Sequence, residues 1–103
     1  MNKVLTLTLK KEWFDLIKSG NKTSEYREHK KHWISRLIKN NRKVKFDKIK
    51  FINGYGSDKP YMIVEFRGLM ISKGQNIYAK NGEAIDNDLE YFIILLGNIL
   101  ECG

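Results

Sequence analysis

The residues best suited to chemistry lie in one short segment, residues 20–27, which reads Gly-Asn-Lys-Thr-Ser-Glu-Tyr-Arg. Lys22 supplies a point charge on a flexible stem, Glu25 a hydrogen-bond acceptor, and Arg27 a planar fork that fits a phosphate or a base edge. Alternate side chains of a strand share a face, so Thr23, Glu25 and Arg27 are predicted to point the same way. The segment suits recognition of a phosphate or a nucleobase. An exposed Glu25–Arg27 pair that contributes little to stability is the alternative.

The elements that must position this segment are a strand and a helix before it and a helix after it. Residues 4–9 alternate apolar and small polar side chains, as a half-buried strand does. Residues 10–19 change to a helical period, and Gly20 is a suitable left-handed stop. Residues 23–28 are predicted to form a strand, and residues 30–40 a second amphipathic helix.

Beyond this point the pattern predicts mostly strands. Residues 48–53, 61–71 and 90–100 are rich in aromatic and β-branched side chains, and Gly68 is a candidate β-bulge. Residues 82–89 are compatible with a loop or a short helix. Two early helices and about five or six strands predict an α+β fold in which the strands curl into a small barrel.

Charge is distributed unevenly along the 103 residues. The net charge is +7, from 19 Lys and Arg against 12 Asp and Glu. Residues 27–50 contain ten Lys and Arg and two acids, whereas residues 81–103 contain five acids and no Lys or Arg. Such a cationic segment attracts polyanions, of which nucleic acid is the most common in a cytoplasm. The alternative is that the lysines keep a small protein in solution.

Three aromatic residues are candidates for stacking on a base. Trp13 and Trp33 lie in the apolar stripes of their helices, so packing against the core is the favoured interpretation for both. The cations near Trp33 are Lys30, Lys31 and Arg36, and aromatic rings among cations bind single-stranded nucleic acid. Tyr55 lies between two glycines in a predicted turn, where base stacking and simple exposure are both possible.

The pattern G-x-K-x-x-E-x-R, formed by Gly20, Lys22, Glu25 and Arg27 directly after an amphipathic helix, resembles that of the ASCH domain family. Similar context continues upstream through residues 13–19 and downstream through the apolar strand at residues 91–97. This family belongs to the PUA-like superfamily of small β-barrels. The resemblance implies a single domain over residues 1–103, with a cleft at the mouth of a barrel and RNA or nucleotide recognition as its role.

The resemblance also implies a possible enzyme. Some small ASCH-like proteins are amidohydrolases acting on N4-acetylcytidine, and others have been proposed to be ribonucleases. The amidohydrolase pattern resembles G-x-K-x-x-T-x-R; Lys22 and Arg27 match it, but Glu25 occupies the place of the threonine. A carboxylate can act as a general base and cannot replace a hydroxyl nucleophile directly. If the protein is catalytic, the candidate residues are Lys22, Glu25 and Arg27.

Other features of the sequence limit the possibilities. His29 and His32 have i, i+3 spacing, but no third metal ligand is evident, so a solvated basic surface is favoured and no metal or cofactor is expected. Cys102 is the single cysteine, which excludes an internal disulfide, and it is given no role. No apolar run approaches a membrane span and no signal peptide is evident, so a cytoplasmic protein without membrane association is expected.

Three functions therefore remain open: an RNA- or nucleotide-binding domain, which is the leading hypothesis, a small hydrolase of RNA or a modified nucleoside, and a basic adaptor for a protein partner. The predicted ligand-binding residues are Lys22, Thr23, Glu25, Arg27, Lys30, Lys31, Trp33, Arg36 and Tyr55.

Overall fold

The computed structural model describes residues 3–55, 58–77 and 83–103. The elements are β1 (Val4–Leu9), α1 (Lys11–Lys18), β2 (Ser24–Glu28), α2 (Lys31–Leu37), β3 (Ile38–Lys39), β4 (Arg42–Lys43), β5 (Lys48–Asn53), β6 (Tyr61–Lys73), a 3-10 turn (Gly74–Asn76) and β7 (Glu90–Cys102). Among these residues no helix is long and apolar enough to cross a membrane.

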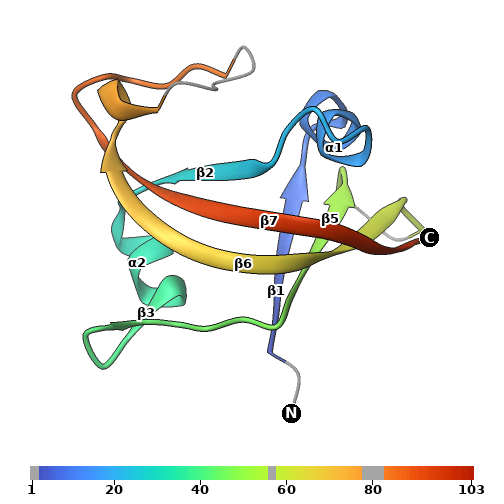
Figure 1. The fold of residues 1–103 in the computed structure, drawn as a ribbon, viewed down its shortest axis with the longest axis horizontal. Coiled ribbons are helices and arrows are strands. Elements are labelled where there is room, and N and C mark those ends of the chain that lie inside the picture. Colours follow the sequence, from blue (N-terminus) through green and yellow to red (C-terminus); the bar gives the residue numbers. More distant parts are fainter. Residues whose placement is uncertain (1–2, 56–57, 78–82) are drawn as a thin grey trace.

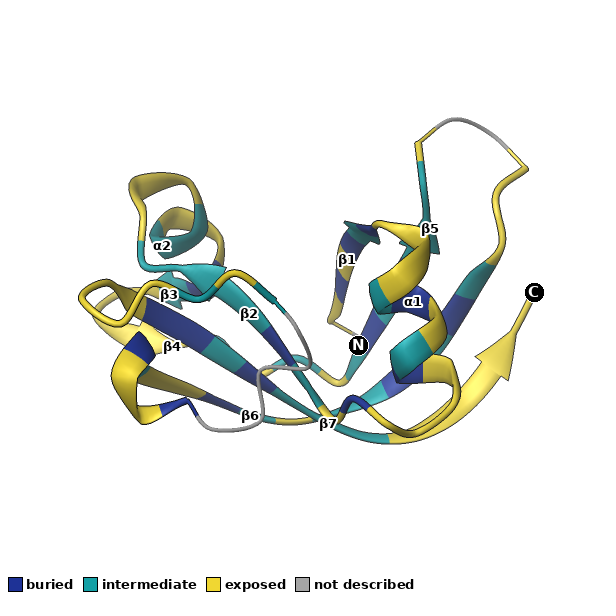
Figure 2. Ribbon diagram, turned by 90° about the horizontal axis from the view of Figure 1, so that it is seen from above, coloured by how far each residue is buried: buried dark blue, intermediate teal, exposed yellow. Residues whose placement is uncertain are grey.

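Five strands form one mixed sheet in the order β1-β5-β6-β7-β2. β1 runs parallel to β5, and the other neighbouring pairs are antiparallel. The long strands β6 and β7 curve across the molecule (Figure 1), and the sheet seen from above is a trough with α1 and α2 on opposite sides (Figure 2). The predicted α+β class with a curled sheet is confirmed. Because β1 and β2 are the two edges of the sheet, the trough is a half-barrel.

A bulge helps to bend the sheet. The pairing of β6 with β7 shifts register between Phe66 and Gly68, so Arg67 is an extra residue on its strand. Gly68 has a φ of 146°, a conformation that side chains rarely permit. The bulge predicted at Gly68 is confirmed, and bulges of this kind increase the local twist of a strand.

The core fills the trough with side chains from one face of β1, β5, β6 and β7. In β1 the alternation predicted from the sequence is confirmed, since Leu5, Leu7 and Leu9 are buried. Phe14 and Ile17 of α1 pack into the same core, together with a third set of side chains from β5, β6, β7 and α2. Each fully buried side chain of this size contributes about 1.5–3 kcal/mol relative to an exposed one.

The second helix is shorter than predicted. We expect it over residues 30–40 from the apolar period, but α2 ends at Leu37, and Ile38 has the extended angles φ −120° and ψ 125°. Asn40 and Asn41 both have a positive φ, 52° and 61°, and Ile38 pairs with Lys43. Asn tolerates this left-handed conformation, so the pair forms the turn of a two-residue hairpin rather than the end of a helix.

The segment before β7 has no regular structure where it is described. Residues 83–89 form a loop with a turn near its end. Of the loop and the short helix that the sequence left open, the loop is confirmed; Gly82 lies outside the described residues. The Asp86 N–H donates a hydrogen bond to Tyr91 Oη at 2.9 Å. A Cβ on Gly74 would lie 2.0 Å from the Asp86 carbonyl oxygen, so only glycine allows this close approach.

Candidate functional site

The turn after α1 places Lys22 under the helix. Gly20 has the left-handed φ of 85°, and the backbone N–H groups of Asn21 and Lys22 both donate to the Leu16 carbonyl oxygen, at 3.0 and 3.1 Å. This reversal directs the chain back toward the core before β2 begins. The side chain of Lys22 is in consequence fully buried.

The ammonium group of Lys22 is surrounded by two carboxylates and two aromatic rings. Its Nζ lies 2.6 Å from Glu83 Oε1 and 3.7 Å from Glu25 Oε1. It also lies 5.7 Å from the ring centre of Trp13 and 4.5 Å from that of Tyr26. A buried ammonium needs such compensation, because removing a charge from water costs several kcal/mol.

Glu25 has one satisfied oxygen and one unsatisfied oxygen. Its Oε1 accepts a 2.8 Å hydrogen bond from the Tyr26 N–H and lies 3.4 Å from Arg27 Nη1. Its Oε2 is buried, and no hydrogen-bond partner for it exists among the residues that the structure describes. A buried acceptor without a partner costs about 1–3 kcal/mol, so the site lacks one donor.

Burial and nearby charge shift two pKa values here. The pKa of Glu83 is raised above its ordinary 4.5, mainly because burial disfavours the ionised form and also because Glu25 is near; Lys22 and Arg27 act in the opposite direction. The pKa of Tyr26 is raised by burial and by the charges of Glu83 and Glu25. Glu83 therefore takes up a proton more readily than an ordinary glutamate does.

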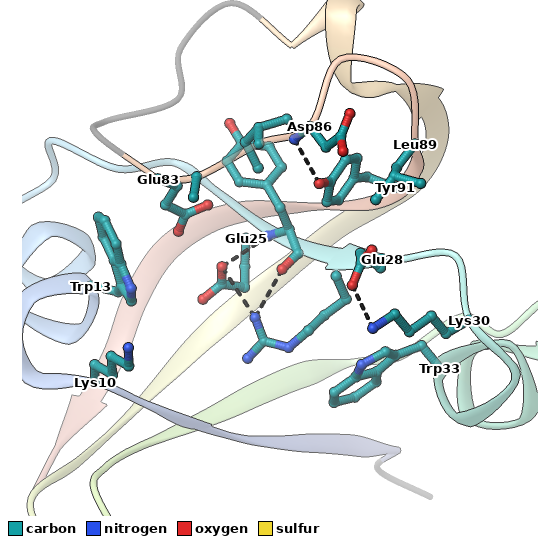
Figure 3. Close-up of a pocket in the computed structure, with 14 residues that line it drawn as sticks. Lys10, Trp13, Glu25, Glu28, Lys30, Trp33, Glu83, Asp86, Leu89 and Tyr91 are labelled. Carbon is teal, nitrogen blue, oxygen red and sulfur yellow. Dashed lines mark hydrogen bonds and ion pairs between the residues drawn. The ribbon is translucent and has the colours of Figure 1, made fainter.

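These side chains border a cavity of about 560 Å³, shown in Figure 3. Its volume is within the range of sites for small organic ligands. Four carboxylates line it, Glu25, Glu28, Glu83 and Asp86, along with three cations, Lys10, Arg27 and Lys30. The aromatic residues in its wall are Trp13, Tyr26, Trp33 and Tyr91. Because four carboxylates and three cations line the cavity, it suits a polar ring with N–H donors better than it suits a phosphate.

A groove continues from the cavity along the open side of the half-barrel, between the two edge strands. It consists of two adjoining hollows of about 370 and 570 Å³ that share Thr8, Arg27 and Tyr55. We call it the seam groove; its lining is residues 6–10 together with Trp13, Arg27, His32, Trp33, Arg36, Gly54 and Tyr55. The Arg36 guanidinium reaches the β1 edge with a 3.5 Å hydrogen bond to the Thr6 carbonyl oxygen.

The structure brings most of the predicted site residues together. Glu25 and Arg27 line the cavity from β2, and Lys22 contacts two of its carboxylates from behind. Lys30 lies at the rim, where it pairs with Glu28 at 2.6 Å. Two more predicted residues, Arg36 and Tyr55, line the seam groove, and Trp33 lines both the groove and the cavity.

Two predicted residues lie elsewhere. Thr23 is exposed and lines a separate hollow beside Gly97 of β7, so it does not share the cavity of Glu25 and Arg27. The reason is that Thr23 precedes the first residue of β2, where the alternation of the strand has not begun. Lys31 is exposed in the first turn of α2 and lines neither the cavity nor the seam groove.

Neither histidine lines the cavity, although His32 lines the seam groove, and Cys102 lines neither. The ring of His29 lies 4.9 Å from that of Phe92, whereas the ring of His32 lies 4.7 Å from that of Trp33. Within the described ranges, no three side chains of the His, Cys, Asp or Glu types form a group that could hold a metal ion. Cys102 is exposed near the end of β7.

Sequence reasoning missed several residues of the site. Lys10, Tyr26 and Tyr91 line the cavity, and Glu83 provides the nearest partner of Lys22 although 61 residues separate them. The acidic composition of residues 81–103 was the only signal for Glu83, and it does not indicate which acid meets the lysine.

Comparison with known proteins does not identify a relative of this chain. Compared with protein-family models, curated proteins and solved structures, the chain matches none of them.

Proposed function

We propose that this protein is a small ASCH-like domain that binds RNA or a nucleotide through the cavity beside β2. The observation that carries the proposal is the buried oxygen Glu25 Oε2, which has no partner within the described part of the chain. This oxygen is shielded from solvent, so a ligand N–H reaches it only if the Glu25 side chain or its neighbours shift as the ligand binds, and the new bond then removes an unfavourable buried acceptor. The exocyclic amino group of a nucleobase is such a donor.

The walls of the cavity support a base as the bound group. Trp13, Tyr26 and Trp33 line the cavity, and stacking on aromatic side chains is the general way in which unpaired bases are held. Arg27 lies at the cavity wall with a side chain that is 19% exposed, so its remaining N–H groups can reach a phosphate next to the base.

Hydrolysis is the second candidate, and the raised pKa of Glu83 favours it. A carboxyl group that holds a proton more readily than usual can protonate a leaving amine as a general acid. None of the described residues lining the cavity is a serine or threonine. The cavity wall therefore offers no serine or threonine hydroxyl as the nucleophile of an amidohydrolase reaction. Glu25 would instead have to act as a base toward water.

The proposal is tested by calorimetric titration with cytidine 5′-monophosphate and adenosine 5′-monophosphate, each compared with its analogue carrying two methyl groups on the exocyclic nitrogen. Methylation removes the N–H donors and keeps the ring. We expect the methylated analogues to bind about 10- to 100-fold more weakly, corresponding to about 1–3 kcal/mol for one unpaired buried group.

Two controls complete the test. Ribose 5-phosphate should bind very weakly, because it lacks the base, and Arg67→Gln, a change in β6 outside the cavity, should leave nucleotide binding unchanged. Equal binding of the methylated and unmethylated nucleotides, or no binding of any nucleotide, would contradict the proposal. Release of cytidine from N4-acetylcytidine, lost in Glu83→Gln, would favour the second candidate.

A further inference from the structure

We infer that the ligand is a single-stranded RNA chain of at least two nucleotides, whose backbone leaves the cavity along the seam groove over Arg27, Arg36 and Tyr55. This inference rests on the proposed function, because it takes one base of the chain to occupy the cavity. It adds a second part to the site, which recognises the phosphates and a neighbouring base.

The cavity and the seam groove are continuous. Arg27 lines the cavity and both hollows of the groove, and Trp33 lines the cavity and one of them. Lys10 and Trp13 likewise belong to the cavity and to the other hollow. A chain whose base lies in the cavity thus has an open path between the β1 and β2 edges.

The two parts of this path differ in their charged residues. The cavity has four carboxylates in its lining, whereas the described lining of the seam groove has none and contains Lys10, Arg27 and Arg36. Acids and cations nearly balance in the first environment, whereas the second is cationic and attracts phosphates. A nucleotide chain has the matching division, with uncharged donor-bearing bases and a charged backbone.

The two arginines of the groove are placed for phosphates. Their guanidinium carbons lie 5.2 Å (Arg27) and 5.4 Å (Arg36) from the ring centre of Trp33, which holds both at the same stretch of groove. Each guanidinium carries five N–H donors, and the contacts with Glu25, the Tyr26 carbonyl and the Thr6 carbonyl engage only some of them.

Tyr55 provides a surface for a second base. Its side chain is 85% exposed, although large aromatic side chains usually bury most of their surface, and it lines both hollows of the groove. An exposed ring beside two arginines fits a stacked base better than it fits an acidic peptide, which offers charges but no flat ring.

The test compares cytidine 5′-monophosphate with 5′-phosphorylated oligocytidylates of two, four and eight nucleotides, titrated at several salt concentrations. We expect the affinity to rise about tenfold or more from the mononucleotide to the tetranucleotide, from one stacked base and added phosphate contacts. Each further phosphate that the protein neutralises should steepen the slope of log K against log salt by about 0.7. In Tyr55→Ala and Arg36→Gln the increase in affinity should shrink severalfold, and in the matched control Arg67→Gln it should persist.

The outcomes separate this inference from the proposed function. If the mononucleotide binds and the oligonucleotides bind no more tightly, only the chain path is wrong. If no nucleotide binds at all, both are wrong. A polyglutamate peptide of the same charge that binds as tightly as the tetranucleotide, with the same loss in Tyr55→Ala, would overturn the inference in favour of a protein partner. DNA oligonucleotides that bind as tightly as RNA would overturn the restriction to RNA.

Discussion

The cavity and the seam groove share Lys10, Trp13, Arg27 and Trp33, but they differ in burial and in charge. The cavity is formed around the buried Lys22 and Glu25 and the partly buried Glu83, whose positions depend on one another. The groove has exposed cations and an exposed ring, with no carboxylate in its described lining. Their contrast indicates that one site can combine two kinds of recognition. Fixed buried polar groups select a base, and surface cations attract a backbone.

The same contrast has a consequence for stability. The buried groups of the cavity compensate one another's charge, so a change to one of them affects folding as well as binding. Arg36 and Tyr55 of the groove are exposed to solvent, and their removal should affect binding alone. Substitutions in the cavity should therefore have larger effects on folding than substitutions in the groove.

The largest effect is expected for Lys22→Met, which keeps much of the side-chain volume and removes the ammonium group. Glu83 would then lose its 2.6 Å ion pair and Glu25 one of the two cations beside it, and removing one partner of a buried ion pair costs about 3–5 kcal/mol. The free energy of unfolding, measured in urea, should fall by this amount at pH 7. The matched control is Lys11→Met, which removes a lysine from the exposed pair with Asp15 and should have no comparable effect.

The loss in Lys22→Met should depend on pH. The pKa of Glu83 is already raised in the folded protein, so the folded state binds this proton more tightly than the unfolded state does. Stability of the variant should therefore recover as pH falls through the raised pKa toward 4.5, and the loss should be greatest at higher pH. A loss that is the same at pH 5 and pH 8 would contradict the assigned charges.

A smaller effect, on selectivity, is expected for Glu25→Gln. Three donors surround the position of Oε1, so the amide oxygen should remain there and the amide nitrogen should replace Oε2. The unpartnered acceptor then becomes a donor, which suits the O4 of uracil and opposes the amino group of cytosine. We expect the ratio of cytidine to uridine monophosphate affinity to fall by about 10- to 100-fold. An unchanged ratio would show that Glu25 does not face the base.

Binding of cytidine, a nucleoside without a phosphate to titrate, should weaken severalfold as pH falls through the raised pKa of Glu83. When Glu83 is protonated, Lys22 can pair more closely with Glu25. Lys22 then competes with the base for the Glu25 carboxylate. Arg27 is the other charged group that faces Glu25 and Glu83. Glu83→Gln should remove the pH dependence in this window. Its persistence in the variant would assign it to another group.

The smallest effect on stability is expected for Tyr55→Ala in the groove. Because Tyr55 is 85% exposed, the free energy of unfolding should change by no more than about 0.5 kcal/mol. A loss comparable to that of Lys22→Met would mean that Tyr55 is part of the folded framework and would remove the contrast between the two regions.

The strands were the part of the fold that the sequence predicted best. The alternation of β1, the limits of β5 and the bulge at Gly68 follow from local side-chain patterns, and local patterns can be read directly. The end of α2 could not be read in this way. Asn40 and Asn41 suit a helix terminus and a tight hairpin equally well, and the pairing of Ile38 with Lys43 decided between them.

The site was predictable only where it is local in sequence. Lys22, Glu25 and Arg27 lie within six residues, and strand geometry brings the last two to one cavity. The burial of Lys22 and its pairing with Glu83 depend on a loop from the other end of the chain, held by the close approach of Gly74 to Asp86. Contacts between distant segments arise from the fold and leave no spacing pattern to detect.

The most direct test of the account is a crystal structure of the protein with a tetracytidylate. We expect one cytosine in the cavity, with its amino nitrogen about 2.7–3.2 Å from Glu25 Oε2, and the following phosphates against Arg27 and Arg36. A complex in which phosphate occupies the cavity beside the four carboxylates, or in which the RNA binds a different face of the half-barrel, would contradict it.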